Sequence, residues 1–221
     1  MKQRFLVIGI GQLGHSLVKN LFREGAEVLA LDTDQNNIDS IKSDSTLSAV
    51  GDCMDIDVLK EIGAPSVDVA IICMGTNFEG SVLALTNLLD LKVPHIAVRA
   101  STQQKAQIFK SIGAHQVFFV EEEMGKVLAH SFSRPNVLHT MDLGFNLKII
   151  EWSPALWAVD KQISELNLQK KYGVQIVAVR HIKKPKEIIN PNPEFRLTVD
   201  HVALLFGTDN DLNKIINQNE L

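Results

Sequence analysis

The sequence predicts an α/β protein in which a doubly wound parallel sheet is followed by a small α+β domain. In the first two-thirds of the chain, short apolar runs alternate with segments of helical periodicity, a pattern typical of parallel strands joined by crossover helices. The apolar runs are continuous rather than alternating, as expected for strands that are buried on both faces. After residue 132 this alternation ends, and the segments that follow are shorter and less regular.

Length and composition support a globular protein. The chain has 221 residues, of which 45% are hydrophobic and 22% are charged, and its net charge is -4. At about 150 residues per domain, this length allows one full domain and a smaller one. The weak negative charge argues against a nucleic-acid partner, which requires a basic face.

The sequence also indicates a protein of the cytoplasm. Its apolar runs are all much shorter than the roughly 20 residues that span a bilayer, and the apolar run at residues 4–10 is too short for a secretory signal. Cys53 and Cys73 are the two cysteines and have no CxxC spacing, which argues against a disulfide framework and a thiolate metal site. We therefore expect a reducing environment.

The first domain, residues 1–132, is expected to contain six strands. Continuous apolar runs predict them at residues 4–8, 28–31, 47–50, 67–73, 95–98 and 117–120. Apolar residues at helical spacing predict the intervening helices at residues 13–24, 35–42, 55–62, 78–91, 102–112 and 121–132. Gly25 and Gly113 follow two of these helices, where glycine commonly ends a helix.

Residues 133–144 are expected to form a linker or a crossing helix, and residues 145–221 a small domain of order β-α-β-β-β-α. The apolar patterns predict strands at residues 145–152, 174–179 and 202–206, and helices at residues 163–168 and 212–216. Residues 183–193 contain three prolines and are expected to form a loop. The partner of the strand at residues 145–152 is not evident from the sequence.

A glycine pattern, Gly9-x-Gly11-x-x-Gly14, lies between the first predicted strand and its helix. In Rossmann-like domains these glycines allow a tight turn, the approach of a pyrophosphate and close packing of helix on strand. The helix N-terminus supplies N–H donors and the positive end of the helix dipole. Asp32, which ends the second strand, can accept hydrogen bonds from both ribose hydroxyls of an adenine nucleotide and disfavours the 2′-phosphate of NADP. The alternative is a Rossmann-like domain that has lost its ligand.

Five further residues follow predicted strands at the same edge of the sheet, where ligands bind in this architecture. Asp52 is expected either to contact adenine or to cap the next helix. Met74 and Gly75 either approach a ligand or form a simple turn. Arg99 either reaches a phosphate or forms a surface ion pair. Glu121 begins a run of three glutamates that either complements a helix dipole or holds a cation at nucleotide phosphates.

The sequence offers no evident catalytic group. Tyr172 is the only tyrosine and Ile176 stands four residues later, so the Tyr-x-x-x-Lys pair of short-chain reductases is missing. The seven histidines are scattered, and none lies beside a nucleophile and a group that would orient it. His15 is the one nearest the glycine loop. A nucleotide site without catalytic machinery favours a sensor rather than an enzyme, with an NAD-dependent oxidoreductase as the alternative.

The first 131 residues resemble the regulator-of-potassium-conductance (RCK) domain, also called the KTN domain. The runs that carry the resemblance are Val7-Ile-Gly-Ile-Gly-Gln-Leu-Gly14, Val28-Leu-Ala-Leu-Asp-Thr-Asp34, Gly51-Asp-Cys53, Val69-Ala-Ile-Ile-Cys-Met-Gly75, Ile96-Ala-Val-Arg-Ala100 and Glu121-Glu-Glu-Met-Gly125. The second part resembles the small C-terminal domain of the same family. Its matching runs are Ile163-Ser-Glu-Leu-Asn-Leu-Gln-Lys-Lys-Tyr-Gly173, Val177-Ala-Val179, residues 191–195 and Val202-Ala-Leu-Leu-Phe-Gly207.

The resemblance implies a cytosolic regulatory subunit of a Ktr-type or Trk-type potassium uptake system. Such a subunit assembles from dimers into a ring, expected to be an octamer, beneath a separate membrane subunit that conducts potassium. ATP and ADP, or NAD and NADH, compete for the Rossmann-like site and change the shape of the ring, so the activity is gating rather than turnover. A regulator of another ion transporter is the alternative. The helix at residues 78–91 and the segment after Glu123 are expected to carry contacts between copies.

The resemblance also implies a set of site residues. The expected nucleotide contacts are Gly9, Gly11, Gln12, Leu13, Gly14, Asp32, Thr33, Asp34, Asp52, Cys53, Met74, Gly75 and Arg99. Glu121 is the expected ligand of a cation at the phosphates.

Two positions depart from relatives of this type. Gln12 stands where they often have an arginine that reaches the terminal phosphates. Its lack of charge weakens the case for selective ATP binding and keeps NAD and ADP as candidate ligands. Gln169 stands where some relatives use an arginine to bind cyclic di-AMP in the small domain, which argues against that ligand, although Pro191 is retained.

Overall fold

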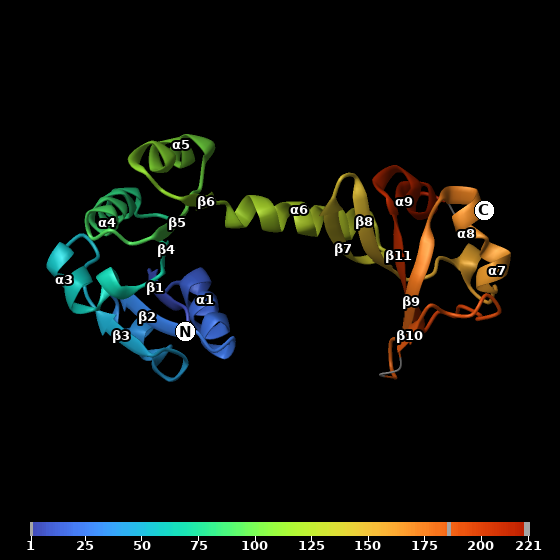
Figure 1. The fold of residues 1–221 in the computed structure, drawn as a ribbon, viewed down its shortest axis with the longest axis horizontal. Helices are drawn as coiled ribbons and strands as arrows, with labels where there is room; N and C mark the ends of the chain where they lie inside the picture. The colour runs from blue at the N-terminus through green and yellow to red at the C-terminus, as the bar shows by residue number, and fades with distance from the viewer. Residues whose placement is uncertain (1, 185–186, 219–221) are drawn as a thin grey trace. The chain divides into compact units, whose positions relative to one another are not determined.

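The computed structural model describes residues 2–184 and 187–218 of the chain, which divides into two compact units, Met1–Met124 and Gly125–Leu221 (Figure 1). The division falls within helix α6 (Val120–Ser133), eight residues before the boundary expected after residue 132. Each unit has its own hydrophobic core.

Within the described residues, the first unit is built on a six-stranded parallel sheet of order β3-β2-β1-β4-β5-β6. Its strands are β1 (Arg4–Ile8), β2 (Glu27–Asp32), β3 (Leu47–Val50), β4 (Val69–Ile72), β5 (His95–Arg99) and β6 (Gln116–Phe118). This confirms the predicted doubly wound sheet. The strand order reverses between β1 and β4, and ligands of open α/β sheets bind in the crevice at such a switch point.

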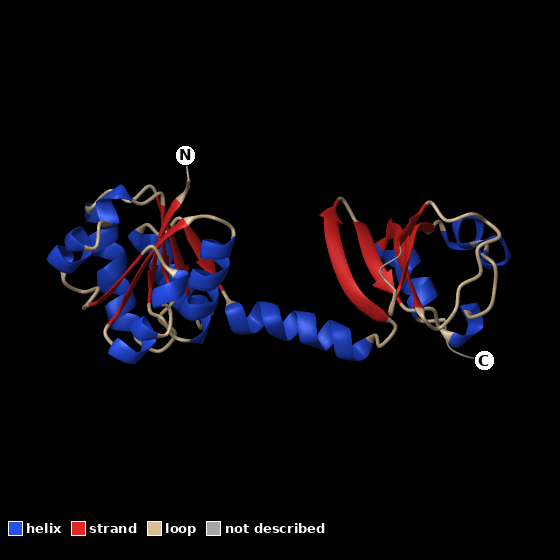
Figure 2. Cartoon of the chain, turned by 90° about the horizontal axis from the view of Figure 1, so that it is seen from below, coloured by secondary structure: helices blue, strands red, loops and turns tan. Residues whose placement is uncertain are grey.

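Helices cover both faces of this sheet (Figure 2). They are α1 (Gln12–Arg23), α2 (Gln35–Asp39), α3 (Ile56–Glu61), α4 (Phe78–Asp90) and α5 (Gln103–Ile112), with 3-10 turns at η1 (Lys42–Asp44) and η2 (Ala64–Ser66). The side chains of β1 alternate between two cores: Leu6 and Ile8 belong to one, and Val7 to the other. Burial on both faces therefore accounts for the continuous apolar runs that predicted the strands.

The second unit contains an antiparallel sheet, which in the part of the chain that the structure describes has five strands of order β10-β9-β11-β8-β7. They are β7 (Val137–Gly144), β8 (Leu147–Trp152), β9 (Gln175–His181), β10 (Glu187–Ile189) and β11 (His201–Thr208). The turn η3 (Leu156–Ala158) and the helices α7 (Ile163–Leu166), α8 (Leu168–Tyr172) and α9 (Asp209–Ile216) complete the unit. Its core is built around Trp152, which is fully buried.

The prediction of a linker or crossing helix at residues 133–144 is wrong for residues 137–144, which form β7. This strand lies at the edge of the sheet, and Val137 alone of its residues is buried. Its register against β8 also shifts twice. An exposed, irregular edge strand lacks the apolar alternation by which strands are recognised. The partners of β8 that the sequence left open are β7 and β11.

Three smaller predictions also differ from the structure. The loop expected at residues 183–193 contains β10, which pairs with β9; residues 185–186 lie outside the described residues. The helix expected at residues 163–168 is divided by Asn167, which has a left-handed φ of 49° that asparagine tolerates. The last helix begins at Asp209, because the Thr208 hydroxyl accepts the N–H of Asp211 and caps it.

No helix within residues 2–184 and 187–218 is both long enough and apolar enough to cross a membrane.

The core of the first unit makes a prediction about stability. Phe109 on α5 is 1% exposed and lies 5.4 Å from the ring of Phe78. We expect Phe109→Ala to lower the free energy of unfolding of this unit by about 3–5 kcal/mol, because it leaves a cavity. Urea unfolding followed by far-UV circular dichroism measures this loss.

The control for this experiment lies next to it on the same helix. Ile108 is 44% exposed, so Ile108→Ala should cost less than about 1 kcal/mol. Both tryptophans, Trp152 and Trp157, lie in the second unit, so their fluorescence should report an unfolding transition that Phe109→Ala leaves in place. An equal loss in both variants would contradict the assignment of Phe109 to the core.

Candidate functional site

A cavity of about 610 Å³ lies at the carboxyl edge of the first sheet. Its lining residues come from the ends of β1, β2, β4 and β5, from the segment after β3 and from the start of α6. They are Ile8, Gly9, Gly11, Leu31, Asp32, Thr33, Gly51, Asp52, Cys53, Met54, Cys73, Met74, Gly75, Thr76, Asn77, Arg99, Ser101 and Glu121. The cavity therefore spans the switch point between β1 and β4.

The turn between β1 and α1 is shaped by two glycines. Gly9 has a φ of +88°, which glycine adopts without strain. A Cβ on Gly14 would lie 2.0 Å from the carbonyl oxygen of Gly9, so α1 packs against the turn more closely than any side chain allows. Helix α1 begins after Gly11 without a side-chain cap. Its first N–H groups are thus available to an anion, and the helix dipole favours one there.

The Asp32 carboxylate is held in place by backbone N–H groups. Its Oδ2 accepts from Ile10 N at 2.5 Å, and its Oδ1 accepts from Asp34 N at 2.8 Å. Each carboxylate oxygen can accept a second hydrogen bond. The arrangement therefore presents a fixed acceptor pair beside the glycine turn, as binding to two neighbouring hydroxyls requires.

Arg99 and Glu121, which both line the cavity, form an ion pair. The guanidinium packs against Gly75, where a Cβ would lie 2.9 Å from Arg99 Nη1. Its Nε is buried and has no hydrogen-bond partner among the described residues. The pKa of Glu121 is lowered, first by a hydrogen bond from its own backbone N–H at the start of α6 and then by Arg99. Of the lining residues, Arg99 is the one cation against three carboxylates.

Asp52 and the two thiols also line the cavity. Asp52 Oδ1 accepts the N–H of Met54 at 2.9 Å. The alternative that Asp52 caps the next helix is wrong, because Asp55 accepts from Asp57 N and caps α3. Burial raises the pKa of Cys53 to about 11 and that of Cys73 to about 12. Both thiols are therefore uncharged at neutral pH, which makes them poor nucleophiles.

The structure brings most of the predicted nucleotide contacts together. Those that line the cavity are Gly9, Gly11, Asp32, Thr33, Asp52, Cys53, Met74, Gly75 and Arg99, together with Glu121. Gln12, Leu13, Gly14 and Asp34 do not line it. Leu13 packs against the core and Asp34 caps α2 by accepting from Asn36 N. A role in binding for these four residues stays a prediction.

Sequence reasoning missed eight lining residues as ligand contacts. They are Ile8, Leu31, Gly51, Met54, Cys73, Thr76, Asn77 and Ser101. All lie within a few positions of a predicted strand end, and that position is the signal that would have found them. Asn77 resembles an ordinary helix cap in sequence and is one: its side chain accepts from Gly80 N at the start of α4.

The structure gives the predicted cation site one carboxylate. No group of three or more His, Cys, Asp or Glu side chains in the described ranges is arranged to hold a metal ion. Glu121 instead pairs with Arg99. A cation at Glu121 would thus need its other ligands from phosphate oxygens or from another copy of the chain.

The second unit has a smaller cavity of about 340 Å³ beside α7 and α8. Its lining residues are Ile163, Ser164, Asn167, Leu168, Gln169, Val174, Gln175, Ile176, Asn190, Pro191 and Pro193, and none of them is charged. Gln169, the position that argued against cyclic di-AMP, is among them.

Comparison with known proteins matches both units. The TrkA-N domain family matches residues 5–120 and the TrkA-C domain family matches residues 153–219. Ktr system potassium uptake protein C of Bacillus subtilis is 30% identical over 97% of this chain and 96% of its own length. Ktr system potassium uptake protein A of the same organism is 29% identical over 98% of this chain and 96% of its own length.

A solved structure has the same fold. The GsuK channel bound to NAD aligns with all of this chain and 40% of its own, with a TM-score of 0.63 and 16% identity. The resemblance to RCK domains seen in the sequence is thereby confirmed. The chain belongs to the family of proteins that join a TrkA-N domain to a TrkA-C domain.

Proposed function

We propose that this chain is a nucleotide-sensing regulatory subunit that gates a membrane potassium uptake channel or transporter. One observation carries the proposal: the chain matches two Ktr potassium uptake proteins over nearly its whole length and theirs. The switch-point cavity of the first unit supplies the sensor. A ligand gates by binding one conformation of the assembly more tightly than the other.

The ligand of the cavity is, in this proposal, an adenine nucleotide, either ATP and ADP or NAD and NADH. The fixed Asp32 carboxylate beside the glycine turn suits a ribose with two free hydroxyls. Arg99 and the start of α1 lie where phosphates would bind. The GsuK channel, which has the same fold, binds NAD. The excess of carboxylates in the cavity favours a ligand of low charge, or one whose phosphates are partly neutralised by a cation.

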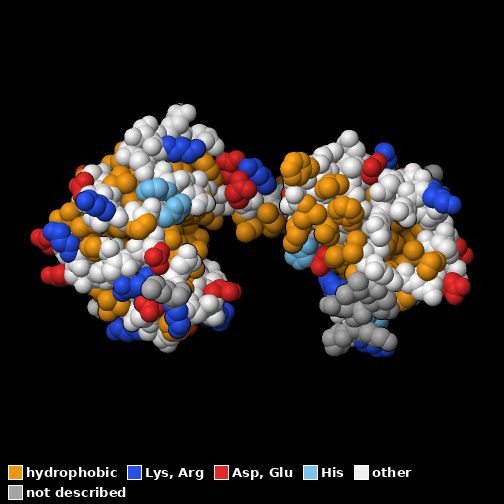
Figure 3. Space-filling model, viewed as in Figure 1, with side chains coloured by type: hydrophobic (Ala, Val, Ile, Leu, Met, Phe, Trp, Pro, Cys, Tyr) orange, Lys and Arg blue, Asp and Glu red, His pale blue; other side chains and the backbone are white. Residues whose placement is uncertain are grey.

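The partners in this proposal are a potassium-conducting membrane subunit and further copies of the chain, arranged as a ring of dimers that we expect to be octameric. Helix α6 supports contacts between copies, because Met124, Val127, Leu128 and Phe132 form one exposed apolar stripe at helical spacing. In the second sheet, Met141, Ile149 and Phe206 form a row across β7, β8 and β11. These three side chains belong to no described core cluster, and hydrophobic side chains gather over β7 and β8 (Figure 3).

The nucleotide site is tested by Asp32→Asn. We expect the affinity for the preferred nucleotide to fall about 10- to 100-fold, because charge-assisted hydrogen bonds to the ribose are lost. Calorimetric titration of nucleotide-free protein with ATP, ADP, NAD and NADH measures the change. Asp90→Asn removes the same charge at the end of α4, away from the cavity, and should leave the affinity unchanged.

The same pair of variants tests the regulatory function. Bacillus subtilis cells without the two matching Ktr uptake proteins should regain growth at low potassium when they express this chain or its Asp90→Asn variant. Cells that express Asp32→Asn should not. Restored growth with Asp32→Asn would separate potassium uptake from nucleotide binding and contradict the proposal.

The cation at Glu121 is tested by Glu121→Gln. We expect Mg²⁺ to tighten ADP binding to the wild type and to lose most of this effect in the variant, since the carboxylate ligand is gone. Glu79→Gln alters another glutamate in the first turn of a helix, which does not line the cavity, and should respond like the wild type. If Glu121→Gln instead binds ADP more tightly without Mg²⁺ and keeps the Mg²⁺ effect, Glu121 acts only as the partner of Arg99.

The assembly is tested by Val127→Asp on α6. We expect the molar mass measured by light scattering to shift from an oligomer toward smaller species, because a buried aspartate disfavours an apolar contact. Leu156→Asp is the control, since Leu156 on η3 is 67% exposed against 61% for Val127. A mass that is unchanged in Val127→Asp, or that falls equally in both variants, argues against contact through the α6 stripe.

A further inference from the structure

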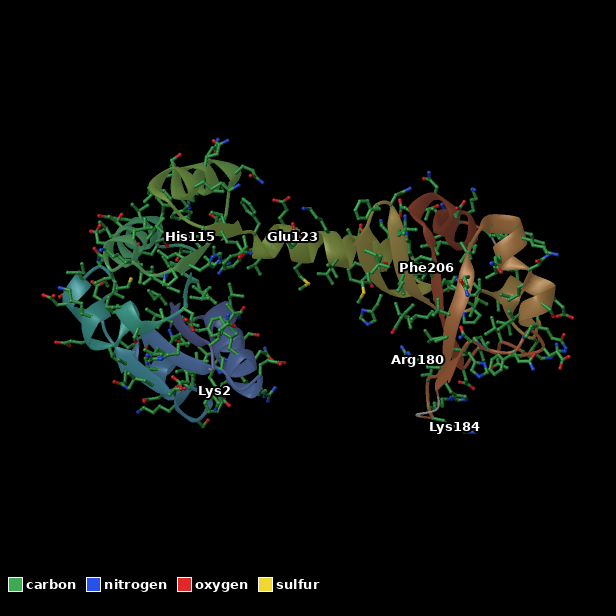
Figure 4. All side chains as sticks on the ribbon, in the orientation of Figure 1. Lys2, His115, Glu123, Arg180, Lys184 and Phe206 are labelled. Carbon is green, nitrogen blue, oxygen red and sulfur yellow. The ribbon has the colours of Figure 1, made fainter. Side chains whose placement is uncertain are left out.

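Two histidines lie side by side at one end of the second sheet. His181 ends β9 and His201 begins β11, and the two residues are paired across these strands. Their ring centroids are 5.4 Å apart and their planes are nearly perpendicular. Arg180, labelled in Figure 4, directly precedes His181 and marks this end of β9.

The hydrogen bonds of both rings define their protonation. Nδ1 of His201 accepts the backbone N–H of Thr198 at 3.0 Å, and Nδ1 of His181 accepts the backbone N–H of Lys183 at 3.1 Å. A backbone N–H can only donate, so each Nδ1 must be unprotonated in this arrangement. The network thus assigns neutral rings with the proton on Nε2.

Thr198 ends a segment that we call the strap, residues 191–198. The strap is bonded along its length to residues 160–164. Leu197 exchanges hydrogen bonds with Asp160 and Lys161, Phe195 O accepts from Ile163 N, and Pro193 O accepts from Ser164 N. The ring of Phe195 also packs against His201 at 5.1 Å between centroids.

The strap forms part of the wall of the second cavity. Pro191 and Pro193 line it from the strap, and Ile163 and Ser164, which are bonded to the strap, line it beside them. The hydrogen bonds that tie the strap to residues 160–164 therefore also close this side of the cavity. The His201 end is the other attachment of the strap.

The surroundings of His201 favour its neutral form. Burial and the neighbouring His181 lower the pKa of His201, and Asp200 opposes them. Asp200 is itself paired with Lys183 at 3.4 Å. This pairing weakens the electrostatic stabilisation that Asp200 can give to a charged His201 ring. From the strap, the groups that contact His201 are Phe195 and Thr198, neither of which titrates.

We propose that His201 forms a pH-responsive clasp that holds the Thr198 end of the strap while its ring is neutral. Protonation turns Nδ1 of His201 into a donor, so the N–H of Thr198 loses its acceptor and two donors face each other. Acidification thus loosens the Thr198 end of the strap, while the hydrogen bonds between the strap and residues 160–164 remain.

The direction of the pH effect follows from the lowered pKa of His201. The closed strap binds fewer protons than the released one, so closure is favoured above the ordinary histidine pKa of about 6.5 and is lost as pH falls through the lower value. Loosening of the strap is therefore expected below about pH 6.5. It does not depend on a nucleotide in the first unit.

Hydrogen–deuterium exchange of the nucleotide-free full chain tests the clasp at pH values of about 5.5 and 7.5. After correction for intrinsic exchange, we expect protection of the Thr198 amide, at the end of the strap, to fall at least about 10-fold at the lower pH. The double variant His181→Asn, His201→Asn should hold its protection at both pH values. An asparagine Oδ1 can accept the same N–H groups but does not titrate.

A second histidine pair supplies the matched control. His95 and His115 in the first unit have ring centroids 5.4 Å apart, and Nδ1 of His115 accepts from Ile96 N at 3.1 Å. His115→Asn should leave the pH response of the strap unchanged. Equal loss of protection in the wild type and the double variant, or no loss in the wild type, overturns the proposal.

A titration of the wild-type rings by NMR covers the case in which the double variant does not fold. His201 should titrate below about 6.5, and its curve should coincide with the loss of strap protection. A strap that stays protected after His201 is charged overturns the clasp. Because neither experiment involves a nucleotide, failure here is distinct from failure of the proposed regulatory function.

Discussion

The close packing of α1 against the turn after β1 is the contact on which the candidate site depends. There is no room for a side chain on Gly14, since its Cβ would lie 2.0 Å from the Gly9 carbonyl oxygen. The same turn fits against the segment that follows β4, where a Cβ on Gly9 would meet Met74 Cγ at 2.8 Å. Asp32 then fastens the turn to β2 through Ile10 N. Packing of helix, turn and two strands thus places N–H donors and a carboxylate on one wall.

The strands of the first unit are largely predictable from sequence, and those of the second are not, because the two sets of strands are buried to different extents. Strands such as β1 are covered on both faces, so every residue from Leu6 to Ile8 is apolar. In the second unit β7 lies at an edge, and seven of its eight residues are exposed. Its positions are thus free to hold His139, Asp142 or Gly144. Neither of its register shifts leaves a mark in the sequence.

In the candidate site, too, residues marked by their own strand could be predicted, whereas contacts between residues distant in sequence could not. Asp32, Asp52 and Arg99 could be predicted, because the strands that carry them are recognisable and parallel strands end at one edge. Small polar residues such as Thr76 and Ser101 look like ordinary turn residues, so their nearness to a strand end is the one signal of their place in the wall. The pairing of Arg99 with Glu121 joins residues 22 positions apart. The sequence allowed a surface ion pair for Arg99 but did not identify its partner.

The balance of charges at Arg99 has a consequence for any anionic ligand. Glu121 is 65% exposed, and ion pairs with exposed partners contribute only about 0–1 kcal/mol. Arg99 is more buried, at 21% exposed, and its Nε has no partner among the described residues. A phosphate that binds Arg99 therefore loses little free energy when it displaces Glu121. Glu121 in turn keeps the hydrogen bond from its own backbone N–H at the start of α6. The free energies of the Arg99–Glu121 pair and of an Arg99–phosphate pair are therefore similar. A modest difference in affinity between two ligands can then decide whether Arg99 binds Glu121 or a phosphate.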